Sequence, residues 1–225
     1  MDAFNAANLT FILNGFWLTI RISALAIVFS IIFGTVLAMI KQYCRGKLSI
    51  FRWIVTAYIE LFRCTPNLLW ILICYVYAPL PTAFLRSSFA FVLFTSAAIA
   101  EIVRGGLNSI AKGQFEAAYS QGFSFVQTLW LIVLPQCFQR IVPTLVSQVI
   151  TVIKDTSFLS MVAVAELMFR SRNALSLLPR YTGQTVGIAQ VGVVFGFAAI
   201  VYFVVNFALS CLVRWLQKRR LRVKA

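Results

Sequence analysis

Residues 22–40 read ISALAIVFSIIFGTVLAMI, a run of 19 residues without a charged side chain. An α-helix over this run is about 28 Å long at 1.5 Å per residue, close to the hydrocarbon thickness of a lipid bilayer. Across the whole chain of 225 residues, 61% are hydrophobic and 12% are charged. Soluble domains are about half apolar and about a quarter charged, so this composition predicts an all-α, polytopic membrane protein.

The charge balance is strongly basic, with 20 Lys and Arg residues against 6 Asp and Glu residues and a net charge of +14. No segment reads as both basic and folded in water, so nucleic-acid binding is not expected, whereas cytoplasmic ends of membrane spans do collect Lys and Arg. The chain has no His, which removes Ser-His and Cys-His catalysis and the commonest metal ligand. We expect no catalytic residue and no metal site. The five cysteines lack metal or redox spacing and are expected to act as small buried hydrophobic residues: Cys44, Cys64, Cys74, Cys137 and Cys211.

Charge-free runs predict the membrane spans of a single membrane domain, residues 1–225. Pro66 is expected to break the second span near its start, and Gly105 with Gly106 is expected to end the third. The five predicted spans cover about residues 15–40, 56–80, 84–104, 137–153 and 191–214.

The fourth span is ambiguous, because residues 117–139 and 141–165 are both largely apolar. The positive-inside rule places the basic segment 41–63 and the basic tail 214–224 in the cytoplasm, so the number of crossings between them is even. Residues 117–139 contain several Ser, Gln and Thr side chains, a poor composition for facing lipid, so the crossing is assigned to the later run. This topology predicts an external N-terminus, a cytoplasmic C-terminus and a long cytoplasmic loop at 105–136.

The predicted loop contains a Glu-Ala-Ala sequence, then a Gly, then a distal Ile-x-Leu-Pro sequence. The residues concerned are Glu116, Ala117, Ala118, Gly122, Ile132, Leu134 and Pro135. This spacing resembles the coupling loop of permease subunits in ATP-binding-cassette importers. The resemblance implies a cytoplasmic coupling helix, between the third and fourth spans, that docks on a separate ATPase.

A short helix in this loop would present one face at the spacing i, i+3, i+4 and i+7. That face consists of Phe115, Ala118, Tyr119 and Gly122. Gly122 is expected to end the helix with a left-handed residue, and Glu116 is expected to offer its carboxylate to a basic group on the ATPase. An amphipathic helix lying on lipid is the alternative. Such helices usually carry several Lys and Arg residues, whereas Lys112 is the nearby cation here, so docking is favoured.

The resemblance extends well beyond the loop and becomes narrower. Residues 58–66, YIELFRCTP, are similar to the Tyr-Ile-Glu-x-x-Arg-Gly-Thr-Pro segment of the polar amino acid permeases, the histidine, glutamine and arginine group. Cys64 stands where that group has Gly, and residues 128–133 lack the cations often found there. Further similar segments are 100–106 (AEIVRGG), 112–114 (KGQ) and 154–157 (KDTS).

The resemblance implies the permease subunit of a polar amino acid importer in the inner membrane of a bacterial cell. The implied partners are ATPase subunits carrying ATP and Mg, a second permease chain, an external solute-binding protein and the lipid bilayer. The chain has no Gly-x-x-x-x-Gly-Lys-Ser/Thr phosphate loop, so it is not expected to be an enzyme. A permease for another small solute and an ion-gradient-driven secondary transporter are the alternatives, although the sequence shows no convincing internal repeat. A membrane anchor would leave the loop spacing unexplained.

Four polar residues near the end of the fourth span have two interpretations: Lys154, Asp155, Thr156 and Ser157. Either they line the substrate pathway, with Asp155 accepting from an ammonium group, or they cap the end of the helix by satisfying freed amides. The sequence favours neither interpretation. Glu166 either faces the same cavity or pairs with Arg170 at i+4, and the pair is favoured.

Three other charged residues are expected to be structural. Glu60 and Arg63 have the i, i+3 spacing of a helical ion pair and are expected to form one at the inner edge of the second span. Arg21 is expected to extend its guanidinium toward the membrane surface.

Overall fold

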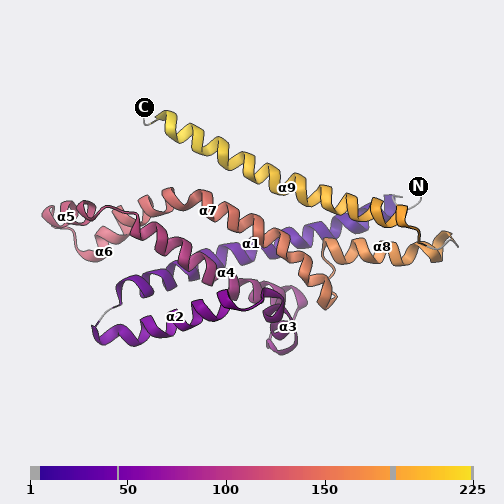
Figure 1. Ribbon diagram of the computed structural model, residues 1–225, viewed down its shortest axis with the longest axis horizontal. Helices are drawn as coiled ribbons and strands as arrows, with labels where there is room; N and C mark the ends of the chain where they lie inside the picture. Colours follow the sequence, from indigo (N-terminus) through magenta and orange to yellow (C-terminus); the bar gives the residue numbers. More distant parts are fainter. Residues whose placement is uncertain (1–5, 45, 183–185, 224–225) are drawn as a thin grey trace. The chain divides into compact units, whose positions relative to one another are not determined.

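The computed structural model describes residues 6–44, 46–182 and 186–223, and all regular elements of these residues are helical (Figure 1). The predicted all-α fold is therefore confirmed. The α-helices are α1 (Ala6–Tyr43), α2 (Ser49–Cys64), α3 (Asn67–Tyr77), α4 (Ala83–Asn108), α5 (Lys112–Ser120), α6 (Phe125–Gln127), α7 (Leu134–Asp155), α8 (Leu167–Thr182) and α9 (Ile188–Val223). The shorter elements are the 3-10 helices Gly46–Leu48 and Thr156–Val162 and the π-helix Thr128–Val133.

Four stretches of the described chain are long and apolar enough to cross a membrane, and α2 with α3 raises the number to five if that pair is one broken span. The chain is thus a polytopic membrane protein, as predicted. α1 alone has 38 residues and a length of about 57 Å, so it is longer than a hydrocarbon core of about 30 Å. The four stretches are Leu9–Tyr43, Ala83–Asn108, Phe125–Val162 and Ile188–Trp215.

The second predicted span is not one continuous helix. α2 ends at Cys64, Thr65 has an extended backbone, and α3 begins after Pro66. Proline has no N–H to donate and disfavours the α conformation in the residue before it, which explains the break at Thr65. The prediction of a break at Pro66 is confirmed.

Two other boundaries differ from the prediction. Gly105 and Gly106 do not end the third span, because α4 continues to Asn108. The fourth span was placed at about 137–153, but the helical stretch that contains it begins at Phe125. α8 falls in no predicted element, since its Arg170, Arg172 and Asn173 make it too polar to be found as a membrane span.

The chain divides into two compact units, which are described separately. Unit 1 comprises the segment that ends at Ile27, Asn67–Phe91 and the segment from Val149 onward. One core of this unit contains Ile12 of α1 and Leu167 and Ala174 of α8, with Phe16 and Phe197 packed against them. α8 lies against α9 in this unit.

Unit 2 comprises Val28–Pro66 and Val92–Gln148. Its core is built from α1, α2, α4, the π-helix and α7, with Ile59, Val103 and Cys137 fully or almost fully buried. α1 and α4 approach closely at Gly34, where an added Cβ would lie 2.8 Å from the Ser96 carbonyl oxygen. Small residues at such contacts let helix backbones pack closely within a membrane.

Candidate functional site

The candidate coupling segment forms a helix and a tight turn in unit 2. α5 ends at Ser120, and Gly122 has a φ of +82°, in the left-handed region. The Phe123 N–H donates to the Ala118 carbonyl at 3.1 Å and the Gly122 N–H donates to the Tyr119 carbonyl at 3.0 Å. These two bonds make a Schellman motif, which satisfies carbonyls at a helix C-terminus. The prediction that Gly122 ends this helix in the left-handed conformation is confirmed.

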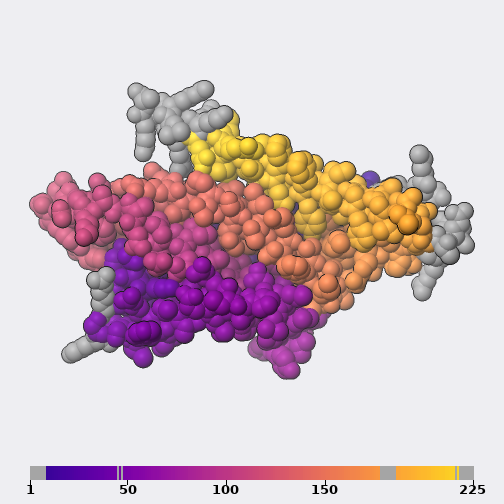
Figure 2. Space-filling model, viewed as in Figure 1, coloured from indigo at the N-terminus to yellow at the C-terminus, as the bar shows by residue number. Residues whose placement is uncertain are grey.

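The exposed face of α5 differs from the predicted one. Ala118 is only 3% exposed and Phe115 is half-buried against the core of unit 2, whereas Tyr119 and Gly122 of the predicted face are exposed. The side chains of Glu116 and Ala117 are exposed as well. Figure 2 shows the segment around α5 at the surface of unit 2. The i, i+3 positions face inward because a helix on a core must bury one apolar stripe, and this is the stripe that α5 has.

The distal part of the motif divides in the same way. Leu134 is 4% exposed and belongs to the core of unit 2, whereas Pro135 is exposed and Ile132 is half-buried. Leu134 therefore packs in the core of unit 2, and its part in ATPase coupling stays a prediction. Pro135 is the second residue of α7 and follows the π-helix directly within one helical stretch, so its missing N–H removes one main-chain hydrogen bond there.

A capping box starts the helix that follows the turn. The Ser124 side chain accepts from the Gln127 N–H at 3.3 Å, and the Gln127 side chain accepts from the Ser124 N–H at 2.9 Å. The sequence signal for this box, which was not among the predictions, is Ser-x-x-Gln before an apolar run. The segment from Phe125 onward is therefore helical, and the cytoplasmic location of residues 125–136 stays a prediction.

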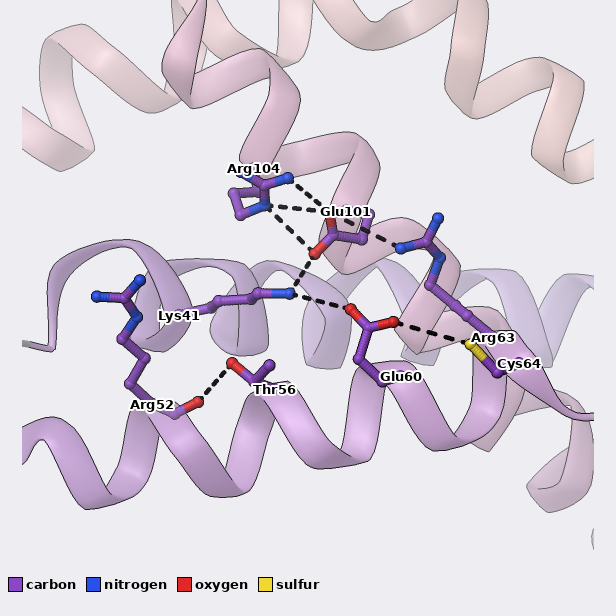
Figure 3. Close-up of polar contacts among 8 residues, drawn as sticks. All are labelled: Lys41, Arg52, Thr56, Glu60, Arg63, Cys64, Glu101 and Arg104. Carbon is purple, nitrogen blue, oxygen red and sulfur yellow. Dashed lines mark hydrogen bonds and ion pairs between the residues drawn. The ribbon is translucent and has the colours of Figure 1, made fainter.

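An ion network joins three helices of unit 2 through Glu101 of α4 (Figure 3). Its carboxylate lies 2.8 Å from Lys41 of α1, 2.7 Å from Arg104 of α4 and 4.0 Å from Arg63 of α2. Glu60 of α2 is 3.8 Å from Lys41. Among the described ion pairs, Glu60 and Arg63 therefore each use another partner, and the predicted Glu60–Arg63 pair is wrong. Both side chains lie on the same side of α2, but the charges of α1 and α4 are within reach of each.

Asp155 and Thr156 lie in unit 1 and have different surroundings. The Asp155 carboxylate is half-buried and accepts from the side-chain amide of Asn67, on α3, at 3.2 Å. Thr156 is fully buried, and its hydroxyl donates to the Ile153 carbonyl at 2.7 Å. Both contacts differ from the amide caps that one interpretation predicted. Lys154 is exposed and Ser157 is half-buried.

Glu166 is fully buried in unit 1 and forms the cap of α8. Its carboxylate accepts from the Met168 N–H at 2.8 Å, the Phe169 N–H at 2.7 Å and the Tyr202 hydroxyl at 3.2 Å. In the sequence, Glu166 lies between two candidate spans, Phe125–Val162 and Ile188–Trp215. Burial raises the pKa of its carboxyl group to about 7, although the hydrogen bonds it accepts favour the ionised form.

Arg170 does not pair with Glu166 as predicted. Its guanidinium donates to the Phe11 carbonyl of α1 and to the Ala165 carbonyl, both at 2.9 Å, and lies over the Phe11 ring. The i+4 spacing brings the two residues close, but the α8 amides already occupy the Glu166 carboxylate. Arg21 lies over the Phe84 ring, 5.2 Å from its centre, so its cation packs on an aromatic face.

The fold and the placement of α5 define a class: a multi-span membrane subunit with a short surface helix between two of its spans. The chain belongs to the family described as the binding-protein-dependent transport system inner membrane component, whose model matches residues 30–222. It is therefore a transport component of the inner membrane and is not itself catalytic.

Individual relatives are similar over almost the whole chain. The chain is 34% identical to the probable glutamine ABC transporter permease protein GlnP of Bacillus subtilis (strain 168), over 98% of each chain. It is 33% identical to the glutamate/aspartate import permease protein GltK of Escherichia coli O157:H7, over 94% of each. Among solved structures, an amino acid ABC transporter with histidines matches with a TM-score of 0.78 and 25% identity, over 94% of each chain. The MetNI methionine ABC transporter shares the fold, with a TM-score of 0.72 and 18% identity over 94% of this chain and 98% of that one.

Proposed function

We propose that the chain is the membrane-spanning subunit of an ATP-driven importer of a polar amino acid. The observation that carries this proposal is the 34% identity to a glutamine permease over 98% of both chains, because such similarity extends through every span and not only through one motif. Glutamine and glutamate/aspartate in the names of the relatives indicate a polar amino acid, without selecting one.

In this proposal, a separate ATPase binds α5 and supplies the energy for transport. Glu116, Ala117 and Tyr119 form the exposed face that it would contact, and Gly122 keeps the following turn free of a side chain. The ATPase would supply ATP and Mg, since this sequence has no phosphate loop. When ATP draws two ATPase subunits together, α5 would carry their motion to the spans, which switch from inward-facing to outward-facing. Hydrolysis then resets them.

Two further partners complete the proposed assembly. The described residues hold at most five spans, which are too few to enclose a gated pathway comfortably, so a second permease chain would form the other half. An external solute-binding protein would deliver the amino acid. The basic residues near the C-terminus favour a cytoplasmic C-terminus, with α5 on the same side and the N-terminus outside.

The substrate pathway is proposed to pass the Asp155 region of unit 1. The half-buried Asp155 carboxylate has acceptor capacity beyond its bond to Asn67, which suits the ammonium group of an amino acid. Ser157 lies two residues further on and offers a hydroxyl to a substrate carboxylate. Thr156 and Glu166 are occupied within the fold, so we assign them to the support of this region and not to direct binding. Lys154 is exposed and would act at the entrance to the pathway.

Transport by purified protein tests the proposal. The chain, its co-purifying ATPase and the solute-binding protein are reconstituted in vesicles, and uptake of a panel of amino acids is measured with and without ATP. We expect uptake of one or a few polar amino acids that requires both ATP and the ATPase. Uptake driven by an ion gradient in the absence of the ATPase would identify a secondary transporter instead, and a membrane anchor would transport nothing.

A further inference from the structure

The elbow between α4 and α5 is compact and turns within three residues. α4 ends at Asn108 and α5 begins at Lys112. The Ser109 N–H donates to the carbonyls of Gly105 and Gly106, and the Ser109 hydroxyl donates to the Gly106 carbonyl at 2.7 Å. The C-terminal carbonyls of α4 are thus partly satisfied inside the elbow itself.

One cation of α7 reaches this elbow. The Arg140 guanidinium donates from Nη1 to the Ser109 carbonyl, and the same nitrogen lies 3.3 Å from the Ser109 hydroxyl. A cation at the C-terminus of a helix is favoured by the helix dipole, and its bond here goes to the backbone of the elbow. Arg140 is exposed and the structure shows no acidic partner for it within the described residues, so a carbonyl and a hydroxyl account for its described contacts.

A second tie joins α7 directly to α5. The side-chain amide of Gln136 donates to the Gln114 side-chain carbonyl at 2.7 Å. Gln136 and Arg140 are four residues apart and therefore lie on one face of α7. We call these two contacts, Arg140 with Ser109 and Gln136 with Gln114, the α7 clamp.

α4 and α7 are also packed closely behind the clamp. A Cβ at Gly106 would lie 2.7 Å from the Cys137 sulfur and closer still to Ile141. The Cys137 thiol lies 3.6 Å from the Val103 carbonyl of α4, in the buried core. The two helices that flank α5 are therefore in direct contact, with the polar clamp at the exposed edge of that contact.

We propose that Arg140 and Gln136 are positioning residues that fix α5 to α4 and α7, so that a displacement of α5 moves both helices together. This inference rests on the proposed function. Its physical basis is directionality: apolar packing resists separation of helices but allows them to slide, whereas hydrogen bonds to a backbone carbonyl and an amide restrict sliding and rotation. Without the clamp, α5 still binds the ATPase but turns at the elbow, and the spans follow less of its motion.

The test measures amino acid taken up per ATP hydrolysed in vesicles that hold the complete transporter. Arg140→Ala is expected to retain the ATPase within about twofold and to lower the uptake per ATP by at least about threefold, within the range of measured coupling effects. Arg140→Lys keeps the charge and one donor, so its ratio is expected to exceed that of the alanine variant. Gln136→Ala removes one exposed neutral bond and is expected to lower the ratio by about twofold. Gln139→Ala, one residue away on the exposed surface, is the matched control and is expected to behave as wild type.

An unchanged uptake per ATP in the assembled Arg140→Ala and Gln136→Ala transporters would overturn the inference, and so would an equal loss in Gln139→Ala. If Arg140→Ala does not assemble, the ratio of Gln136→Ala decides the question alone. A purely stabilising role predicts a lower unfolding temperature with an unchanged ratio. Gly122→Asp separates this inference from the proposed function: if that variant retains the ATPase and full uptake, docking through α5 is refuted, whereas normal clamp variants refute the clamp alone.

Discussion

Glu101 of α4 and Lys41 of α1 form an ion pair of 2.8 Å whose side chains are each only 16% exposed. Arg104 adds three further hydrogen bonds to the same carboxylate, of 2.7, 3.1 and 3.3 Å. One half-buried acid therefore pairs with cations of two helices, while the α2 charges lie farther away and are more exposed (Figure 3).

Glu101→Gln is expected to lower the free energy of unfolding by roughly 2 kcal/mol, because it leaves Lys41 and Arg104 partly buried without their carboxylate. The loss stays below that of a fully buried pair, since the Arg104 side chain is 35% exposed. Thermal unfolding in detergent measures the effect.

Glu60→Gln is the control for that variant. The Glu60 side chain is 53% exposed and 3.8 Å from Lys41, so its loss is expected to change stability by less than about 1 kcal/mol. Equal destabilisation by the two variants would contradict a network centred on Glu101.

Gly106→Ala and Gly105→Ala are expected to act in opposite directions although the two glycines are adjacent. A Cβ at Gly106 collides with Cys137 and Ile141, which is expected to cost about 1–3 kcal/mol as overpacking. A Cβ at Gly105 meets nothing within 4 Å, so alanine there is expected to stabilise α4 by up to about 1 kcal/mol through helix propensity. Unfolding temperatures of the two variants check the contrast, and similar values would contradict the close approach of α4 and α7.

Glu166 predicts a dependence of stability on pH. Its pKa is raised from 4.5 to about 7 in the fold, so the folded state holds a proton that the unfolded state has already lost between these values. Stability is therefore full below about pH 4.5 and falls as the pH rises toward about 7, by at most about 1.4 kcal/mol per pH unit. Glu166→Gln keeps an acceptor oxygen for α8 and removes the titration. Unfolding curves from pH 5 to 8 should slope less in this variant than in wild type; the same slope in both would assign the effect to another group.

Gly122→Asp is expected to leave the chain in the membrane and to weaken ATPase binding. The left-handed φ of +82° costs a residue with a side chain about 1–2 kcal/mol, and the added carboxylate enters the proposed docking turn. Gly46→Asp is the matched control, since Gly46 also has a left-handed φ, of +63°, and open space around it. Co-purification of the ATPase with each variant measures the difference. Equal retention by both would argue against docking at Gly122.

Asp155→Asn is expected to raise the KM of uptake by about tenfold or more if the carboxylate contacts the substrate ammonium, because a charge-assisted hydrogen bond is lost. Ser157→Ala is expected to change the KM by less, since one neutral hydrogen bond is removed. Uptake assays across substrate concentrations check this. A wild-type KM in Asp155→Asn would exclude direct binding at that carboxylate.

Several features of this molecule are local in the sequence and could be predicted from it. The membrane class, the break at Pro66 and the left-handed turn at Gly122 each depend on a short run or a single residue type. The distal half of the motif was less predictable, because the Ser124 cap and the π-helix extend the helical stretch to Phe125 where composition suggested a loop. α8 was not predicted, because its polar residues lower the hydrophobicity of the segment. Its apolar residues can be recognised as one face only once α8 is seen packed against α9.

Spacing along a helix did not predict the partners of the charged side chains correctly. Both predicted helical pairs, Glu60 with Arg63 and Glu166 with Arg170, have suitable spacing and neither forms. In each case a group from a distant segment, such as Lys41 or the Phe11 carbonyl, lies close enough to compete.

The sequence alone determined that the chain is a bundle of apolar helices with one short motif between two of them, because hydrophobicity and backbone preferences act over a few residues. The tertiary structure decided which face of α5 is exposed, where each cation finds its acceptor, and how α7 holds the elbow. Those outcomes depend on distances between segments that are far apart in the chain, and such distances exist only once the helices have packed.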